Sequence, residues 1–227
     1  EIVFSKLIKF KVGNKVSLGA DFEKKNNLAF GYEIDGGFSQ YIYLTKKYAS
    51  KAPISKFKKN ISYDEAALAE PLGCCINGIE KMKFKSNKIV TIFGAGPIGL
   101  MIALLVKKFR SKKIFIVDKS LVRLKIAKKI LSCETIQYNK ISFMKDFFNK
   151  NNQMGSDYIF TANPSIESHK AALKIANKGS FINLFGGVSK KNSKISLDSN
   201  YIHYNEINLM GSHGSSHRQH KKALKMK

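Results

Sequence analysis

The stretch IVTIFGAGPIGLMIALLV, residues 89–106, predicts a buried strand, a glycine turn and a buried helix in direct succession. Gly94 permits a tight bend, Gly96 lets a pyrophosphate approach the backbone, and Gly99 lets the helix pack closely on the strand. The helix N-terminus adds N–H groups and the positive end of the helix dipole. The stretch therefore predicts a turn that binds the phosphates of a nucleotide.

A second apolar run, Ile114 to Val117, ends at Asp118. It lies roughly 20 residues beyond the glycines, where the dinucleotide-binding fold places an acid that binds the ribose hydroxyls. The order of strand, turn, helix, strand and acid favours a dinucleotide site over an accidental buried βαβ unit. An acid there repels a 2′-phosphate, so the sequence favours NAD over NADP. Lys119 and Arg123 weaken this preference, unless they are only solvated charges on a helix face.

The rest of the chain after the glycine turn continues the same alternation of strands and helices. Further strands are predicted at residues 135–138, 157–160, 181–185 and 207–210. Six strands alternating with helices predict an α/β fold with a doubly wound parallel sheet.

The first part of the chain has a different pattern. Residues 1–53 contain short alternating runs punctuated by glycine, which is typical of strands in a small β domain. We expect residues 21–27 to form a polar loop, and a glycine turn at residues 35–37 to lead into a strand at residues 38–44.

Glu70 lies at a predicted junction between two helices. Ser62 and Glu65 form a capping box at the start of the first helix, Pro71 ends it, and a second helix runs from Leu72 to Met82. A carboxylate held by two elements suits a functional site. Composition alone favours the alternative, in which Glu70 caps a helix N-terminus.

Composition excludes several classes of protein. The 227 residues are 44% hydrophobic, no apolar run reaches the ~18 to 20 residues of a membrane span, and no signal-peptide pattern is present. We therefore expect a globular cytoplasmic protein without a membrane partner. The three cysteines form neither a disulfide framework nor a C-x-x-C zinc pattern, and we expect them to be small buried residues.

The formal net charge of +24 is the most unusual property of the composition. Such a charge can indicate binding to nucleic acid or to a membrane surface. The lysines are spread over the whole length, however, and no recognised nucleic-acid-binding motif accompanies them. A coding bias towards A and T explains the abundance of Lys, Ile and Asn, so we expect no nucleic-acid partner.

Several motifs follow one another in a characteristic order along almost the whole chain. They are Asp35–Phe38 with Tyr41, Glu70–Leu72 with Cys74, Asn77–Gly78, Gly94–Leu100, Asp118, Asn183–Gly187, Ile202–Tyr204 and Gly211–Ser212. In this order the chain resembles the zinc-type medium-chain dehydrogenases, in particular the branch of polyol (sorbitol or L-iditol) and L-threonine 3-dehydrogenases.

This resemblance implies both a fold and an activity. The fold would be a Rossmann NAD-binding domain at residues 73–212, a partial GroES-like catalytic domain at residues 1–72 without its N-terminal part, and the start of the C-terminal return at residues 213–227. The activity would be zinc-assisted hydride transfer from a secondary alcohol or polyol to NAD. The full-length enzyme would be a homo-oligomer.

The resemblance also assigns site residues. Glu70 would stand beside the catalytic zinc, as a direct ligand or through water, and would be both the catalytic and the metal residue. The cofactor contacts would be Gly94, Gly96, Pro97, Ile98, Gly99, Asp118, Lys119, Arg123, Phe185, Gly186 and Gly187.

The chain departs from the family pattern in its metal ligands. A ligand cysteine, a Gly-His-Glu motif and a four-cysteine loop, all typical of the family, are missing from this sequence. We therefore expect a fragment of a longer enzyme, inactive alone. The alternative is a non-catalytic dinucleotide-binding protein that has lost its zinc ligands.

Three histidines, His213, His217 and His220, offer a competing metal site. Residues 214–216 interrupt a helix between the first and the other two, which disfavours a shared ligand geometry. We expect these histidines at the surface or at a domain junction.

Overall fold

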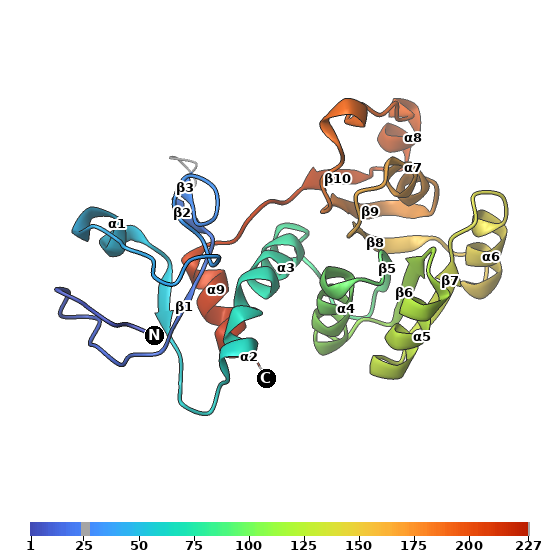
Figure 1. Ribbon diagram of the computed structural model, residues 1–227. Coiled ribbons are helices and arrows are strands. Elements are labelled where there is room, and N and C mark those ends of the chain that lie inside the picture. The colour runs from blue at the N-terminus through green and yellow to red at the C-terminus, as the bar shows by residue number, and fades with distance from the viewer. Residues whose placement is uncertain (24–27, 227) are drawn as a thin grey trace. The chain divides into compact units, whose positions relative to one another are not determined.

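The computed structural model describes residues 1–23 and 28–226. The chain divides into two compact units (Figure 1). One consists of Glu1–Asn77 together with His213–Lys227, and the other of Gly78–Ser212.

The unit of residues 78–212 is built on a six-stranded parallel sheet. Its strands are β5 (Ile89–Phe93), β6 (Lys113–Asp118), β7 (Glu134–Gln137), β8 (Ser156–Thr161), β9 (Ala176–Leu184) and β10 (Asn208–Gly211). Their order is β10-β9-β8-β5-β6-β7, and each neighbouring pair is parallel. The prediction of a doubly wound α/β sheet is confirmed, with its topological switch point between β5 and β8.

Helices cover both faces of this sheet. They are α4 (Pro97–Lys108), α5 (Leu121–Ile130), α6 (Phe143–Lys150), α7 (Ile166–Lys174) and α8 (Ser199–Tyr204), with a 3₁₀ turn at Lys190–Asn192. Phe93 and Phe115 share a core cluster with residues of α6 and α7. Ile92 points to the opposite face, where its side chain meets Gly99 of α4. The alternating strand residues are thus buried on both sides, as a doubly wound sheet requires.

In its described residues, the other unit contains two small antiparallel ladders and four helices. The strands β1 (Val16–Leu18) and β4 (Ile54–Lys56) pair with each other, as do β2 (Asp21–Glu23) and β3 (Leu28–Ala29). The helices are α1 (Lys46–Lys51), α2 (Tyr63–Ala67), α3 (Ala69–Lys81) and α9 (His217–Leu224), and α3 continues across the unit boundary.

Two predictions for this β region are wrong. Residues 38–44 form no strand, and Phe38, Tyr41 and Tyr43 are exposed. An alternating pattern becomes a strand only where a neighbour completes its hydrogen bonds, and this segment has no ladder partner among the described residues. The expected loop at residues 21–27 begins instead with β2, and its residues 24–27 lie outside the described part of the chain.

The two helices predicted on either side of Glu70 are present, but the second begins earlier than predicted. The Ser62–Glu65 capping box is present, whereas α3 already begins at Ala69. Pro71 therefore lies in the first turn of α3, where the missing N–H costs no helical hydrogen bond. Glu70 lies in the same turn.

A buried chain of hydrogen bonds joins α9 to β1 and β4. Ser17 and Ser55 face each other across the two strands. Ser17 Oγ donates to the Ala66 carbonyl (2.9 Å) and therefore accepts from His220 Nε2 (3.0 Å). The neutral ring then accepts at Nδ1 from Ser55 Oγ (3.3 Å), whose oxygen accepts from His217 Nε2 (3.1 Å). His220 is fully buried, so the expected surface position is wrong for this histidine.

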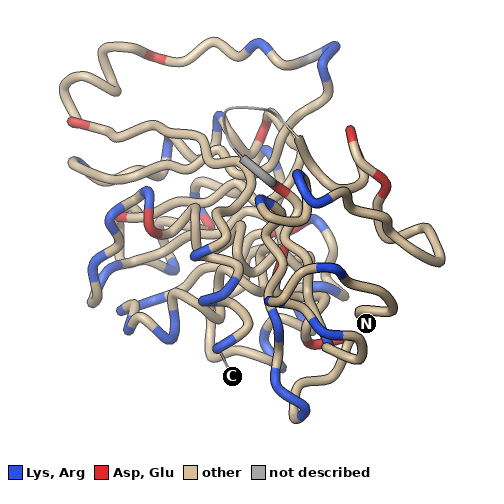
Figure 2. Tube along the Cα trace, turned by 90° about the vertical axis from the view of Figure 1, so that its left-hand side faces the viewer, with Lys and Arg blue, Asp and Glu red and all other residues tan. Residues whose placement is uncertain are grey.

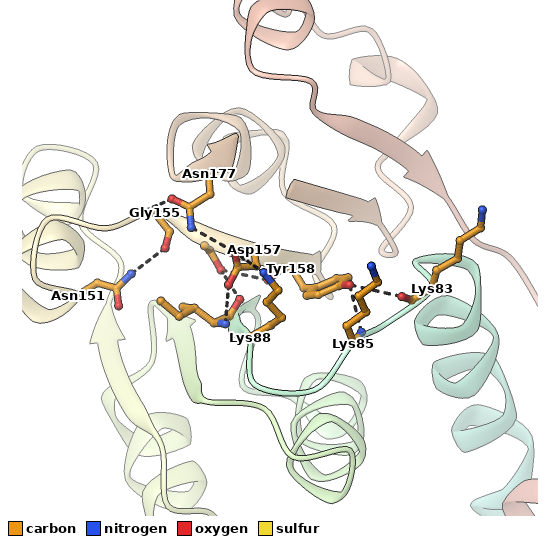
Figure 3. A network of polar contacts seen from close by, with 10 residues as sticks. Lys83, Lys85, Lys88, Asn151, Gly155, Asp157, Tyr158 and Asn177 are labelled. Carbon is orange, nitrogen blue, oxygen red and sulfur yellow. Dashed lines mark hydrogen bonds and ion pairs between the residues drawn. The ribbon is translucent and has the colours of Figure 1, made fainter. Parts of the chain in front are cut away.

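A second polar network lies where the strands of the large sheet begin (Figure 3). Asp157 Oδ2 accepts from the Ile89 backbone N–H (2.8 Å), and its other oxygen faces Lys88 (3.8 Å) and Asn177 Nδ2 (3.4 Å). Asn177 in turn accepts from the Gly155 N–H (2.9 Å). One carboxylate thus fixes the first residues of three neighbouring strands.

In the described residues, no helix is long and apolar enough to cross a membrane.

We predict that Asp157→Asn lowers the free energy of unfolding by about 1–3 kcal/mol, because an amide has one acceptor oxygen and leaves either the Ile89 N–H or the Asn177 side-chain amide without its acceptor. The control is Glu206→Gln, which breaks an exposed ion pair with Lys178 (3.5 Å) and should cost less than ~1 kcal/mol. Urea denaturation of both variants measures the difference. Equal effects would show that the Asp157 network does not hold the strand ends.

A second prediction concerns acid. Burial and the neighbouring His217 lower the pKa of His220 to about 4. The unfolded chain therefore binds the proton more readily than the folded one, and stability is lost as pH falls below about 6.5. Because of the lowered pKa of His220, we expect the free energy of unfolding to fall by about 2 kcal/mol when the pH is lowered from 7 to 5.

Urea denaturation at both pH values tests the acid effect. His220→Gln should be less stable at pH 7, because it loses the Ser17 and Ser55 bonds, but its stability should change less between the two pH values. His203→Gln, at an exposed position of α8, should keep the original pH dependence. An unchanged pH dependence in His220→Gln would contradict the prediction.

Candidate dinucleotide site

The glycine turn between β5 and α4 has the geometry that its sequence predicts. Gly94 has a φ of +114°, and a Cβ at this residue would lie 2.7 Å from the Ala162 carbonyl oxygen. A Cβ at Gly99 would collide with the Gly94 carbonyl. Gly96, in contrast, faces open space, because no atom lies within 4 Å of its Cβ position. Gly94 and Gly99 thus allow the close backbone contacts of the turn, and Gly96 leaves open space next to it.

Asp118 ends β6 beside this turn. One carboxylate oxygen accepts from the Ala95 N–H (2.7 Å), and the other from the Ser120 N–H (2.8 Å). The side chain thereby joins the end of β6 to the turn after β5. Each carboxylate oxygen retains a second lone pair, so hydroxyl donors of a ribose can still bind to the half-buried group.

The ends of four neighbouring strands are joined by short backbone hydrogen bonds. Gly94 N donates to Val117 (2.7 Å), Ala162 N to Phe93 (2.8 Å) and Gly186 N to Thr161 (2.6 Å). A Cβ at Gly186 would lie 2.5 Å from the Asn163 carbonyl oxygen. The backbone from Thr161 to Asn163 therefore forms part of the same strand-end surface. The sequence analysis missed this segment, although its position after a predicted strand marks it.

The three residues predicted after β9 differ in their surroundings. The Phe185 ring packs on Gly78 of α3, where a Cβ would lie 3.0 Å away, and Gly187 is exposed. Gly186 lies next to the buried His169 of α7. Burial lowers the pKa of this imidazole, and a hydrogen bond with the Gly186 backbone opposes the shift. His169 therefore supports the strand end, a position that the sequence does not reveal.

The remaining predicted cofactor contacts surround the turn. Pro97 occupies the first position of α4, after Gly96 as its N-cap, and Ile98 follows it. Lys119 and Arg123 are exposed next to Asp118, at the start of α5. A dinucleotide fits this set of residues, because the open space at Gly96 can hold a pyrophosphate and Asp118 can bind a ribose.

Glu70 belongs to the other unit, where it contacts a thiol. Cys74 lies one helical turn further along α3, and its Sγ donates to Glu70 Oε1 (3.3 Å). Burial raises the pKa of the Cys74 thiol far above its usual range, and the Glu70 charge adds to this. The same causes raise the pKa of Cys75 to about 12. Without a metal ion, both thiols are therefore protonated at neutral pH.

Zinc does not fit the described residues alone. Among them, no three His, Cys, Asp or Glu side chains lie close enough together to hold a metal ion. Among the described residues, His213, His217 and His220 do not form such a group. Catalytic zinc usually has three protein ligands, and Glu70 supplies at most one.

Comparison with known proteins gives consistent results. Residues 97–226 match the zinc-binding dehydrogenase family. Sorbitol dehydrogenase of Bacillus subtilis (strain 168) is 28% identical over 178 residues, which are 78% of this chain and 48% of the relative. The chain spans about half the length of the curated relatives that it matches.

Solved structures share the fold. An alcohol dehydrogenase from E. coli CFT073, complexed with NADH, is 25% identical, with a TM-score of 0.73 over 86% of this chain and 55% of that one. A Sinorhizobium meliloti 1021 protein bound to NADP is 18% identical, with a TM-score of 0.81 over 96% of this chain and 66% of that one. The six-stranded sheet, its glycine turn and the family match over more than half of the chain lead to one conclusion: the chain belongs to the zinc-binding dehydrogenase family.

Proposed function

We propose that this chain is the cofactor-binding part of an NAD-dependent dehydrogenase that oxidises a secondary alcohol or a polyol. The observation that carries the proposal is the pairing of Asp118 with the glycine turn, through its hydrogen bond to Ala95 (2.7 Å), beside the open space at Gly96. Membership of the family and the sorbitol dehydrogenase relative support the reaction class. When bound, the nicotinamide of NAD would accept a hydride from the alcohol carbon.

We assign different tasks to the two units. The unit of residues 78–212 would bind the dinucleotide, with the pyrophosphate at the N-terminus of α4 and the adenosine ribose on Asp118. The strand-end residues Phe185 to Gly187 would lie near the nicotinamide. The other unit would belong to a GroES-like catalytic domain, and Glu70 would serve there beside a metal whose remaining ligands come from outside the described residues.

NAD is favoured over NADP by the charge of Asp118, because a 2′-phosphate at the same ribose would face a carboxylate. Lys119 and Arg123 oppose this preference, since both are exposed beside it. The relatives do not decide the matter, because the two structures described above contain NADH in one case and NADP in the other.

We predict that the chain binds NADH at least about tenfold more tightly than NADPH, which corresponds to about 1.4 kcal/mol. Asp118→Asn removes the charge and also one of the two carboxylate oxygens that accept from Ala95 and Ser120, so it should weaken NADH binding and narrow this difference. Asp146→Asn, on α6, is the control with the same loss of charge and should leave the ratio unchanged. Fluorescence titration with both cofactors measures it. Equal affinities in the unaltered chain would show that Lys119 and Arg123 override the acid.

A further prediction tests the Glu70–Cys74 pair. Glu70→Gln removes a negative charge that raises the pKa of Cys74, so its alkylation by iodoacetamide at pH 8 should be faster than in the unaltered chain. Asp64→Asn, in the first turn of α2, should leave the rate unchanged. Mass spectrometry of the modified peptide gives both rates.

The same assay distinguishes the dehydrogenase from its alternative, a dinucleotide-binding protein without metal. For this chain alone we expect added Zn²⁺ to give Cys74 no protection, because too few ligands are present. In the longer protein, protection of Cys74 and dependence of turnover on Glu70 would support a metal site there. Tight NADH binding without metal or turnover in the longer protein would favour the non-catalytic alternative.

A further inference from the structure

One edge of the sheet in the unit of residues 78–212 carries a group of basic side chains. In a doubly wound sheet the helices run antiparallel to the strands, so helix C-termini lie at the edge where strands begin. The last turns of α4, α5, α6 and α7 all carry lysine, namely Lys107, Lys108, Lys128, Lys129, Lys150 and Lys174. We call this edge, opposite the glycine turn, the amino edge.

The connecting segments add further cations to the amino edge. Lys83 and Lys85 lie between α3 and β5, as Figure 3 shows. Arg110 and Lys112 connect α4 to β6, and all four side chains are exposed. A lysine in the last turn of a helix interacts favourably with the negative end of the helix dipole. This interaction accounts for the lysines at the helix ends. The dipole does not explain the cations of the loops.

Hydrogen bonds join the basic segments at the starts of β5, β6 and β7. The Lys112 N–H donates to the Lys88 carbonyl (2.9 Å), and Lys113 Nζ donates to the Lys150 carbonyl (2.6 Å). Lys150 Nζ reaches the Thr135 carbonyl at the start of β7 (3.3 Å). The acceptors in these bonds are neutral backbone carbonyl groups, so the positive charges of the lysines are not neutralised. These bonds span three neighbouring strands, β5, β6 and β7, a width of about 10 Å at the spacing of strands in a sheet.

Cys133, which follows α5, is influenced by lysines from the ends of two helices. Burial raises the pKa of the Cys133 thiol, whereas Lys128 of α5 and Lys107 of α4 both oppose that shift. Cations of two different helices thus act on one side chain.

Acidic residues are fewer at the amino edge. They are Glu80, Glu134, Asp157 and Glu206. Asp157 is engaged by Lys88 and by backbone N–H groups, and Glu206 pairs with Lys178. The whole chain has 40 basic and 16 acidic residues, so most cations cannot have an acidic partner of their own. Figure 2 shows how basic positions outnumber acidic ones along the trace.

We propose that the amino edge binds the phosphate backbone of a nucleic acid without sequence specificity. Exposed lysines and an arginine at adjacent strand starts and helix ends can meet successive phosphates of a linear polyanion. The proposal reverses the expectation from sequence and does not depend on the proposed dehydrogenase activity. Because the glycine turn lies at the other edge, nucleic acid and NADH bind independently.

The test compares two variants that lose the same charge at different places. Lys112, Lys128 and Lys129 are replaced by glutamine at the amino edge, and Lys190, Lys191 and Lys194 in the control, where these exposed lysines lie near the start of α7. Fluorescence anisotropy follows a labelled single strand and a duplex of about 20 nucleotides or base pairs in about 50–200 mM NaCl. Circular dichroism confirms that both variants are folded.

We expect the amino-edge variant to weaken binding at least about tenfold at about 100 mM salt, and to lower the slope of log K against log salt by about 2. The control should change the dissociation constant by less than about threefold, and saturating NADH should have no effect. The absence of binding at about 50 mM salt, equal losses in both variants, or competition by NADH would overturn the proposal. Binding to phosphatidylserine vesicles but to neither oligonucleotide would overturn it in favour of a membrane surface.

Discussion

The hydrogen bond from the Ala95 N–H to the Asp118 carboxylate is the interaction on which the candidate site depends. It joins the turn after β5 to the end of β6, so that the group expected to bind a ribose also fixes the loop expected to bind a pyrophosphate. The bond can form only because Gly94 adopts a positive φ and Gly99 lets α4 approach the turn. A side chain at either glycine would move the helix away from the strand, and with it the N–H groups that make its N-terminus attractive to anions.

The two edges of the large sheet have different chemistry because strand and helix directions alternate along the chain. Helix N-termini and the glycine turn meet at one edge, and lysine-bearing helix C-termini meet at the other. At the amino edge, Asp157 joins the starts of neighbouring strands, so that the charged loops rest on a fixed backbone. The proposed cofactor site and the basic amino edge therefore lie at opposite edges of one sheet.

The other unit illustrates how a small region without a large sheet is held together. Its ladders are short, and its core cluster contains Phe10, Ala52 and Ile54. The buried bonds among Ser17, Ser55 and His220 add directional contacts between α9 and the strands β1 and β4. Such a network needs a neutral imidazole, since a protonated ring would present a second donor to Ser55. The stability of this unit is therefore coupled to pH.

The sequence by itself determined the strands of the large sheet, the glycine turn and the position of Asp118, because these follow from local periodicity and from residues that only one backbone geometry accommodates. It also placed Glu70 in a helix junction, since the capping box and Pro71 act within a few residues. The tertiary structure alone decided the rest. The pattern at residues 38–44 needed a partner strand that the described fold does not provide, and the His220 network joins residues far apart in the chain. Lysines spread evenly along the sequence come to lie near one another only when parallel strands bring their starts to one edge, which is a consequence of topology and not of any local motif.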